Sequence, residues 1–371
     1  MRVALLLPDL RPGGAERVGV NLANEFASRG FAVDLVLMQR QGELLPLVNP
    51  EVSIVDLASP RVRYAVRPLA AYLKKRKPTA LLANMWPLTV TAIAVSRLAR
   101  LRIRVVVVEH APWSVFIRTH KFLHRVAIRL SMRFLMPWAD ERVGVSGGVA
   151  TDLELLARLR AGTVHAVFNP VTGFKAQASP GPEMSTAQAW VNSFGKKVIA
   201  IGALKSEKRF DRLLHAFARL PDRDTVLMIL GEGGERKNLE TLAQTLSIDG
   251  RVFLPGFTRN PAYYLRRADL FVLSSDYEGF GNVVAEALEQ GTPVVSTDCP
   301  YGPREILEDG KYGTLVPAGD VGALARAMED ALNREHDHEA LRRRAQDFSV
   351  DKAADAYLDL LLPGWRKGSA A

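Results

Sequence analysis

With 371 residues, the chain is long enough for two domains of ordinary size, and its 48% of hydrophobic residues is typical of a globular protein and excludes a disordered one. A single cysteine, Cys299, excludes an internal disulfide and favours a reducing cytoplasm. The formal charge of +9 arises in the first half, since residues 1–170 carry +12. This distribution indicates a phosphate-bearing or anionic partner there. The sequence has no apolar run long enough for a membrane-spanning helix.

Short β-branched runs alternate with helical patterns along the whole chain. In the first half, strands are predicted at residues 3–7, 33–38, 81–84, 105–109, 142–146 and 164–168. In the second half, they are predicted at residues 198–202, 225–231, 252–254, 270–274, 293–297 and 314–316. Buried strands separated by helices predict parallel sheets with right-handed crossovers.

A stretch rich in Gly, Pro, Ser and Thr separates the two series of strands. We therefore predict an α/β protein with two doubly wound, Rossmann-like domains that face each other across a cleft. The predicted parts are an N-terminal domain (1–171), a linker (172–196), a C-terminal domain (197–350) and a final helix with tail (351–371). Packing on the N-terminal domain is one option for that last helix. Ligands are expected at the carboxyl ends of the strands.

Two glutamates, Glu278 and Glu286, flank a glycine-rich loop and the start of a helix. We place Asn282 near the N-cap, residues 283–290 in the helix and the helix end at Gly291. Both carboxylates then lie beside the helix N-terminus, which is an anion site. Carboxylates suit such a site when they accept hydrogen bonds from neutral hydroxyls, so the pattern favours a sugar nucleotide. The alternative is that Glu286 only complements the helix dipole and that Glu278 is a solvated loop residue.

This E-x7-E pattern, followed by GTPVVSTDCPYGPREIL, resembles the retaining GT-B glycosyltransferases of glycosyltransferase family 4. Further matches are PGGAER from Pro12, NPV from Asn169, EKRFD from Glu207 and GEG from Gly231. They cover nearly the whole chain in the family's order. The resemblance implies transfer of a hexose or N-acetylhexosamine from a nucleotide sugar. A UDP-linked donor is favoured over a GDP-linked one. It implies no metal and no other cofactor.

The resemblance also implies roles for individual residues. Glu278 would contact hydroxyls of the donor sugar, Glu286 the ribose hydroxyls, and Lys208 the diphosphate. His110, at the end of the strand 105–109, would face the donor sugar; the alternative is a satisfied histidine at a strand end. The remaining substrate-binding positions that the motifs imply are Gly13, Gly14, Gly231, Gly233, Gly279, Phe280, Gly281 and Asn282.

One position departs from the family pattern. Ala203 stands where the family usually has an arginine that assists Lys208. Lys205 or Arg304 could compensate for it. The alternative to an active enzyme is therefore a catalytically impaired protein that binds sugar nucleotides.

Other motifs point to rival functions. The sequence GVSGG around Ser146 matches the nucleophile elbow of serine hydrolases, but no HGGG-type segment accompanies it, and Ser146 is expected to be a helix N-cap. The sequence DRD at Asp222 and the charged segment 335–339 are expected to be hydrated surface rather than metal ligands. No nucleic-acid-binding signature is present.

From His110 to Ala139 the sequence contains no acidic residue. Basic residues recur there at four-residue steps, so they lie on one arc of a predicted helix: Lys121, Arg125, Arg129 and Arg133, with Arg118 nearby. Apolar residues form a second arc: Phe116, Leu123, Val126, Ala127, Leu130 and Phe134. Such a helix either packs on its sheet with a solvated basic face or docks on an anionic membrane. The lack of carboxylates favours docking.

The DCPYGPREIL variant resembles enzymes of bacterial surface-polysaccharide and lipid-linked oligosaccharide assembly. This resemblance implies an acceptor that is a lipid-linked or membrane-surface glycan, as in polysaccharide or lipopolysaccharide biosynthesis. The expected location is cytoplasmic and peripheral, on the inner face of the cytoplasmic membrane.

Overall fold

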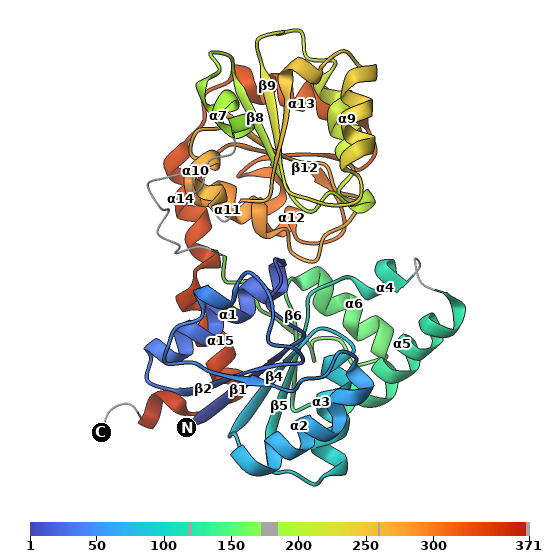
Figure 1. Ribbon diagram of the computed structural model, residues 1–371, viewed down its shortest axis with the longest axis vertical. Helices are drawn as coiled ribbons and strands as arrows, with labels where there is room; N and C mark the ends of the chain where they lie inside the picture. Colours follow the sequence, from blue (N-terminus) through green and yellow to red (C-terminus); the bar gives the residue numbers. More distant parts are fainter. Residues whose placement is uncertain (118–120, 172–184, 259, 369–371) are drawn as a thin grey trace. The chain divides into compact units, whose positions relative to one another are not determined.

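The structure, a computed structural model, describes residues 1–117, 121–171, 185–258 and 260–368. By its internal contacts, the chain divides into two compact units. Unit 1 comprises residues 1–170 and the segment from Ser349 onward, and unit 2 runs from Val171 to Phe348. Each unit is an open parallel sheet covered by helices (Figure 1), which confirms the predicted pair of Rossmann-like folds.

The sheet of unit 1 has the strand order β3-β2-β1-β4-β5-β6-β7. Its strands are β1 (Arg2–Leu7), β2 (Ala32–Leu37), β3 (Ser53–Asp56), β4 (Ala80–Asn84), β5 (Arg104–Glu109), β6 (Glu141–Gly144) and β7 (His165–Ala166). The strand order reverses between β1 and β4, which is where Rossmann-like sheets bind ligands. β3 escapes prediction because it is a short, partly exposed edge strand, and β7 is shorter than the predicted strand 164–168.

The helices of unit 1 cover both faces of this sheet. They are α1 (Gly14–Ser28), α2 (Val62–Arg76), α3 (Leu88–Leu98), α4 (Trp113–Phe116), α5 (Phe122–Leu135), α6 (Gly147–Ala157) and α15 (Val350–Leu361). Ala4 and Leu6 share a core cluster with buried residues of α2, α3, α5 and α6. Leu7, on the opposite face, lies against Gly19 of α1. Both faces of the sheet are therefore shielded from water, which explains why the strands consist of continuous apolar runs.

Unit 2 repeats this architecture with the strand order β10-β9-β8-β11-β12-β13. Its strands are β8 (Lys197–Ile201), β9 (Val226–Leu230), β10 (Val252–Gly256), β11 (Leu270–Leu273), β12 (Val294–Asp298) and β13 (Thr314–Pro317). Its helices are α7 (Ser185–Asn192), α8 (Phe210–Phe217), α9 (Arg236–Thr245), α10 (Pro261–Leu265), α11 (Asn282–Gln290), α12 (Pro303–Ile306), α13 (Val321–Asn333) and α14 (His338–Ala345). The order reverses between β8 and β11.

The predicted linker is partly helical. Residues 185–192 form α7, which packs near β9 and β10 and buries Trp190 completely. The helix is not predicted because this segment is composed mainly of small and polar residues, and Trp190 is its one large aromatic residue. Residues 172–184 of the predicted linker lie outside the described part of the chain.

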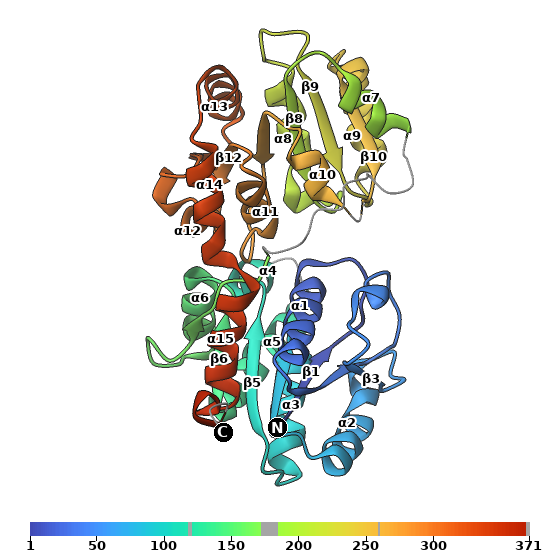
Figure 2. The same ribbon diagram turned by 90° about the vertical axis from the view of Figure 1, so that its left-hand side faces the viewer.

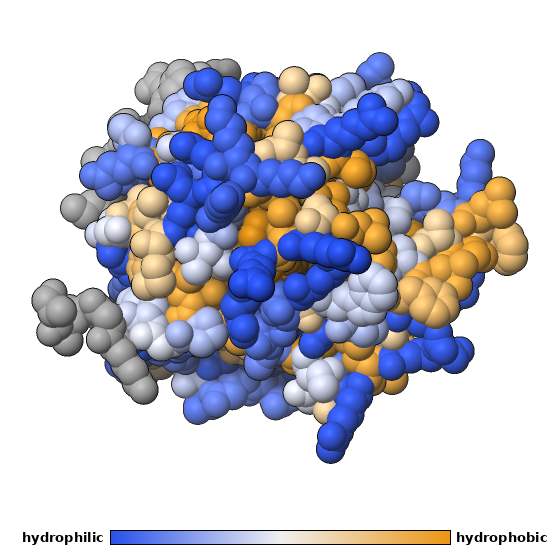
Figure 3. Space-filling model, turned by 90° about the horizontal axis from the view of Figure 1, so that it is seen from below, coloured by the Kyte–Doolittle hydropathy of each residue, from blue (hydrophilic) through white to orange (hydrophobic). Residues whose placement is uncertain are grey.

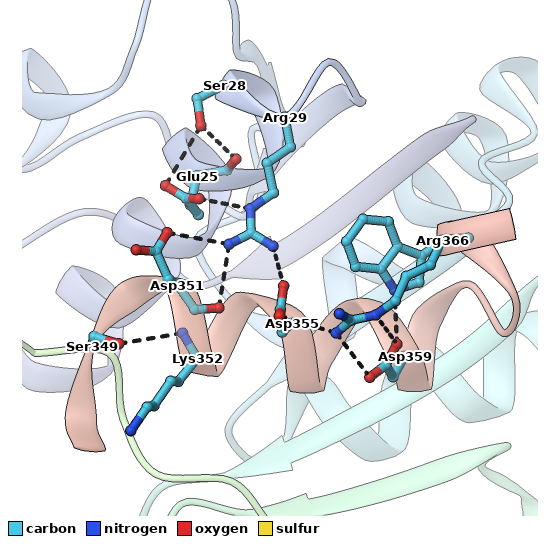
Figure 4. A network of polar contacts seen from close by, with 10 residues as sticks. Glu25, Ser28, Arg29, Ser349, Asp351, Lys352, Asp355, Asp359 and Arg366 are labelled. Atoms are coloured by element: carbon cyan, nitrogen blue, oxygen red, sulfur yellow. Dashed lines mark hydrogen bonds and ion pairs between the residues drawn. The ribbon is translucent and has the colours of Figure 1, made fainter. Parts of the chain in front are cut away.

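The last helix, α15, packs in unit 1 along α1, as both views show (Figures 1 and 2). Arg29 at the end of α1 connects the two helices (Figure 4). Its guanidinium contacts Glu25 at 2.7 Å on its own helix, and Asp351 at 3.3 Å and Asp355 on α15. Ser349 caps α15 by accepting a hydrogen bond from the Lys352 N–H group.

We predict that Arg29→Ala lowers the free energy of unfolding of unit 1 by about 1–2 kcal/mol, because it leaves partly buried carboxylates without a partner. The matched variant Asp351→Asn should change it by less than about 0.5 kcal/mol, because the Asp351 side chain is 84% exposed. Urea unfolding followed by circular dichroism measures both. Equal effects of the two substitutions would contradict the assigned role of Arg29.

Candidate active site

Lys208 lies in the connection between β8, a central strand of unit 2, and α8. β8 leads through a short loop into a 3-10 turn, η4 (Ser206–Lys208), and then into α8. Ser274, which follows β11, donates a hydrogen bond of 2.7 Å from its hydroxyl to the Lys208 carbonyl oxygen. This bond fixes the turn at the point where the strand order reverses, between β8 and β11. The Lys208 side chain therefore starts from an anchored backbone.

The Lys208 ammonium pairs with the carboxylate of Glu278, and the distance from Nζ to Oε1 is 2.6 Å. Both side chains are largely buried, with exposed fractions of 20% and 11%. Ser275 donates a second hydrogen bond of 2.6 Å from its hydroxyl to the same oxygen. The Glu278 backbone is held as well, by Pro300 O at 2.8 Å and the Tyr301 N–H group at 3.0 Å. The structure thus brings together two residues that the motifs name separately.

The pair retains capacity for a ligand. An ammonium has three N–H donors, and within the described residues Lys208 uses one of them, on Glu278. The Glu278 side-chain contacts both involve Oε1, so Oε2 has no hydrogen-bond partner among the described residues. Such a pair can donate to a phosphate oxygen and accept from a hydroxyl at the same time. This combination matches the chemistry of a sugar nucleotide.

The predicted helix after Glu278 is α11, and it begins one residue earlier than predicted. Gly281, not Asn282, is the N-cap, since the backbone there has φ +92°, a left-handed conformation that favours glycine. Asn282 is the first helical residue, and Gly291 ends the helix as predicted. Glu286 lies at the fifth helical position and is partly exposed. The positive end of the α11 dipole therefore follows the Glu278 loop directly.

The other predicted glycine positions are explained by close packing of the backbone. Gly231 has φ +148°, and a Cβ atom there would lie 1.9 Å from the Gly202 carbonyl oxygen. A Cβ atom at Gly233 would lie 2.4 Å from the Leu204 oxygen. Gly279 and Phe280 are in the loop before α11, and the Phe280 ring is buried against Phe348 at 5.4 Å. The Phe280 side chain is thus part of the core of unit 2.

In unit 1, His110 follows β5 and pairs with Asn84, which ends the neighbouring strand β4. The distance from His110 Nε2 to Asn84 Oδ1 is 3.1 Å. Because the amide oxygen accepts, Nε2 carries the proton, and Nδ1 is an acceptor. Nδ1 is buried and has no partner among the described residues. Burial lowers the pKa of His110 to about 4, so the ring is neutral at physiological pH and can accept a hydrogen bond from a hydroxyl.

Gly13 and Gly14 lie at the same carboxyl edge of the sheet, after β1. Gly13 is the N-cap of α1, and Gly14 is its first residue. A Cβ atom at Gly13 would lie 2.0 Å from the Glu16 Oε2 atom. A glycine here therefore leaves room for the Glu16 carboxylate over the helix N-terminus.

Two functional candidates in unit 1 are missing from the predictions: Asn84, described above, and Glu109. Glu109 is fully buried and accepts hydrogen bonds from Thr89 Oγ1 at 2.7 Å, Trp113 Nε1 at 2.8 Å and Trp86 N at 3.1 Å. Burial raises its pKa to about 7. Its bonds connect the segment that follows Asn84 with the segment that follows His110. A polar residue that ends an apolar strand, as in LLAN and VVVVE, is the signal that could have revealed both.

The structure distinguishes between Arg304 and Lys205, the two candidates to replace the arginine that the family usually has at the position of Ala203. Arg304 is engaged with Asp298 and, at 3.0 Å, with Asp309. Lys205 is exposed in the loop between β8 and η4, and it forms no ion pair within the described residues. Lys205 is therefore the better candidate for a second positive charge beside Lys208.

The rival motifs have structural explanations. The Ser146 side chain is fully buried and caps α6 by accepting a hydrogen bond of 3.1 Å from the Val149 N–H group, as predicted. Asp222 accepts from Asp224 N at 3.0 Å and Thr225 Oγ1 at 2.7 Å, which is typical of a turn. Among the described residues, no three His, Cys, Asp or Glu side chains gather in a group that could hold a metal ion.

The basic helix is α5, and its apolar arc faces solvent. Ile128 and Met132 are its buried side chains, whereas large apolar side chains of the predicted arc and its neighbour are exposed: Phe122 by 73%, Leu123 by 80%, Leu130 by 50% and Phe134 by 61%. Packing of α5 on the sheet therefore does not explain why these positions are apolar. Arg125, Arg129 and Arg133 lie on the adjacent arc, Lys121 precedes the helix, and Arg118 lies outside the described residues. No helix in the described part of the chain is long and apolar enough to cross a membrane.

We predict that the free energy of unfolding of wild type falls, relative to His110→Gln, as the pH drops from 7 to 5. The pKa of His110 is about 4 in the folded state, below its usual value of 6.5. Between these values the unfolded chain binds the proton and the folded chain does not, so acid favours unfolding. The expected relative loss is on the order of 1–2 kcal/mol at pH 5, measured by urea unfolding. A difference between the two proteins that does not change with pH would contradict this.

Comparisons with known proteins identify families for both halves of the chain. Residues 12–172 match the family model "Glycosyltransferase Family 4", and residues 188–348 match "Glycosyl transferases group 1". The lipopolysaccharide core biosynthesis glycosyltransferase LpsE of Rhizobium meliloti is 39% identical over 44% of this chain and 49% of its own. A 4-alpha-N-acetylgalactosaminyltransferase of Campylobacter jejuni, whose name specifies a diphospho-undecaprenol substrate, is 33% identical over 45% of this chain and 47% of its own. The matched part thus spans about half the length of these relatives.

A structural comparison covers nearly the whole chain. The crystal structure of Anabaena Alr3699/HepE in complex with UDP superposes with a TM-score of 0.78 at 22% identity, over 97% of this chain and 99% of that one. At this identity, the likeness shows a shared fold. Together, the two family matches and the paired Rossmann-like sheets show that the chain belongs to the family 4 type of GT-B glycosyltransferases.

Proposed function

We propose that this protein is a retaining glycosyltransferase that moves a hexose or N-acetylhexosamine from a UDP-linked sugar to a lipid-linked or membrane-surface glycan. The observation that carries the proposal is the Lys208–Glu278 pair beside the N-terminus of α11. It offers donors for a diphosphate and an acceptor for a sugar hydroxyl at one place. The role in bacterial polysaccharide or lipopolysaccharide assembly is supported by the relatives named above. UDP is favoured because a protein of the same fold was crystallised with it.

In the proposed reaction, the bond between the sugar C1 and the diphosphate oxygen breaks, and the acceptor hydroxyl oxygen bonds to C1 on the same face. The acceptor proton moves to the departing phosphate oxygen. Lys208 and the positive end of α11 stabilise the growing negative charge, which is how preorganised donors accelerate such steps. Glu278 and Glu286 bind sugar and ribose hydroxyls, and His110 Nδ1 accepts from a hydroxyl of the donor sugar. The proposal assigns no role to a metal ion.

A protein that binds sugar nucleotides without transferring the sugar is the second candidate. Ala203 favours it, because a methyl group cannot neutralise phosphate and Arg304 is engaged elsewhere. The two candidates differ in one result, since only the enzyme releases UDP from a labelled donor when acceptor membranes are present. Addition of EDTA should leave that release unchanged if no metal takes part.

We predict that Lys208→Ala lowers kcat by 10²- to 10³-fold, or about 2.7–4 kcal/mol, if Lys208 stabilises the departing diphosphate as an oxyanion donor does. The matched control is Lys311→Ala, which removes an exposed lysine of unit 2 that pairs with Glu308. It should keep wild-type turnover. Release of UDP from a radiolabelled donor measures kcat. Thermal-shift assays with UDP and GDP test donor binding separately, because a ligand that binds the folded state raises its apparent stability. Wild-type turnover in Lys208→Ala would remove Lys208 from the catalytic group.

The acceptor part of the proposal depends on α5. Figure 3 shows hydrophobic side chains that protrude at the right-hand edge, the side on which Figure 1 places α5, with hydrophilic side chains around them. Exposed apolar side chains next to arginines suit an anionic bilayer, where the former enter the headgroup region and the latter contact phosphates. We propose that α5 docks the protein on the inner face of the cytoplasmic membrane, where lipid-linked glycans are presented.

We predict that the double substitution Leu130→Glu and Phe134→Glu weakens binding to vesicles of phosphatidylglycerol and phosphatidylcholine at least tenfold at low salt. The reason is that it removes apolar surface and adds negative charge at the docking helix. Leu155→Glu, at an exposed position of α6, is the matched control and should bind as wild type does. Vesicle flotation measures both. Equal binding of wild type and the double variant would defeat the assignment of α5.

A further inference from the structure

An open apolar groove lies on unit 1 between α2, α3 and the end of α5. Its lining includes Val66 and Ala70 of α2, Ala94 and Leu98 of α3, and Leu135 of α5. The one polar side chain in the lining is Thr91, as far as the described residues show, and its hydroxyl donates to the Pro87 carbonyl at 2.9 Å. The groove therefore offers a ligand no unsatisfied hydrogen-bonding side chain. A sugar, a nucleotide or a polar peptide would lose hydrogen bonds to water there.

The rim of the groove is basic. On α2, Arg63, Arg67 and Lys74 are exposed. Arg63 lies three residues before Val66, Arg67 lies three residues before Ala70, and Lys74 lies four residues after Ala70. The three basic residues therefore share the helical face that lines the groove. Two exposed arginines, Arg100 and Arg102, follow α3. The ligand that this rim attracts is therefore an anion.

Carboxylates do not balance this charge. Between Asp56 and Asp140 the sequence contains one acidic residue, Glu109, against sixteen Lys and Arg. Glu109 is fully buried in its own hydrogen-bond network, and Asp140 is paired with Arg97 at 2.8 Å. A partner that carries negative charge fits this surface, whereas a second copy of the chain would place one basic rim against another.

The groove is continuous with the docking helix. Leu135, in the lining, is the last residue of α5, the helix that exposes Leu130 and Phe134. Leu98, in the lining on α3, is itself 79% exposed, and Trp138, just after α5, is also exposed. Figure 1 shows α2, α3 and α5 on one side of the sheet, and their buried residues share one core cluster. The apolar surface thus runs from the docking helix into the groove.

We propose that this groove binds one hydrocarbon chain of an anionic membrane lipid, whose phosphate contacts the basic rim on α2. The lining excludes a polar occupant, the rim selects an anion, and the neighbouring helix faces the source of such lipids. The proposal rests on the membrane docking of α5, and it adds a binding site for a single lipid that is separate from the nucleotide-sugar residues.

The test uses a fluorescent label on a new cysteine. The native Cys299 is buried, so bimane reacts selectively with Leu98→Cys at the groove or with Leu155→Cys on α6. The probe is short-chain phosphatidylglycerol with brominated acyl chains, added below its micelle concentration. We expect saturable quenching at Leu98→Cys and at least fivefold weaker quenching at Leu155→Cys. Phosphatidylcholine with the same chains should need at least a fivefold higher concentration, because its headgroup has no net charge.

A substitution that fills the groove completes the test. Ala94→Phe in the Leu98→Cys background should abolish the saturable quenching. Val66→Glu, at an already exposed position, repeats the test in case the larger side chain impairs folding. Equal quenching at both labels, quenching that survives both substitutions, or a dimer that these substitutions dissociate in analytical ultracentrifugation would overturn the proposal.

The lipid readout is independent of sugar transfer. Donor hydrolysis should be unchanged in Ala94→Phe, since Ala94 is not among the nucleotide-sugar residues. Monomeric lipid should still quench when the double substitution Leu130→Glu and Phe134→Glu removes vesicle docking. If wild type shows saturable quenching but no sugar transfer, the proposed transfer reaction alone would be contradicted. Intact turnover without quenching would contradict the lipid site alone.

Discussion

The ion pair between Lys208 and Glu278 is the interaction on which the functional interpretation of unit 2 depends. Removing two charges from water is unfavourable unless further hydrogen bonds stabilise them. Here Ser275 supplies a hydrogen bond to the carboxylate, and Ser274 fixes the backbone of Lys208. The pair is thus held in place before any ligand arrives. Groups that are preorganised in this way need little rearrangement when charge develops in a reaction.

The surrounding loops form a frame for this pair by close backbone contacts. Gly231 lets the loop after β9 approach the Gly202 carbonyl, and the Thr297 hydroxyl donates to Ser275 O at 2.7 Å from the end of β12. Glu278 itself is bonded to the segment after β12. The loops at the carboxyl ends of β8, β9, β11 and β12 are therefore mutually supported. A site built on such a frame gains its precision from the sheet beneath it.

Unit 1 has the same fold and a different distribution of chemistry. Its carboxyl edge carries neutral or buried polar groups, namely His110 with Asn84 and the buried Glu109. Its helices α2, α3 and α5 carry cations and exposed apolar side chains, with no acidic residue among them. One sheet thus supports two surfaces of opposite character, a polar edge suited to sugar hydroxyls and a basic, apolar flank suited to anionic lipid. Both surfaces support the acceptor proposed above, which combines a glycan with a lipid.

The sequence by itself determined the two parallel sheets, most strands to within two residues, the Ser146 cap, the end of α11 at Gly291 and the family motifs. These features depend on residues close together in the chain, where periodicity and capping preferences act. Only the tertiary structure decided that Lys208 meets Glu278, because their contact requires β8 and β11 to be neighbours. It also decided that Gly281 caps α11, that α7 occupies part of the predicted linker, and that α5 buries Ile128 and Met132 instead of its larger apolar arc. Periodicity shows which side chains share a face, but which face is buried depends on the shape of the surface against which the helix packs.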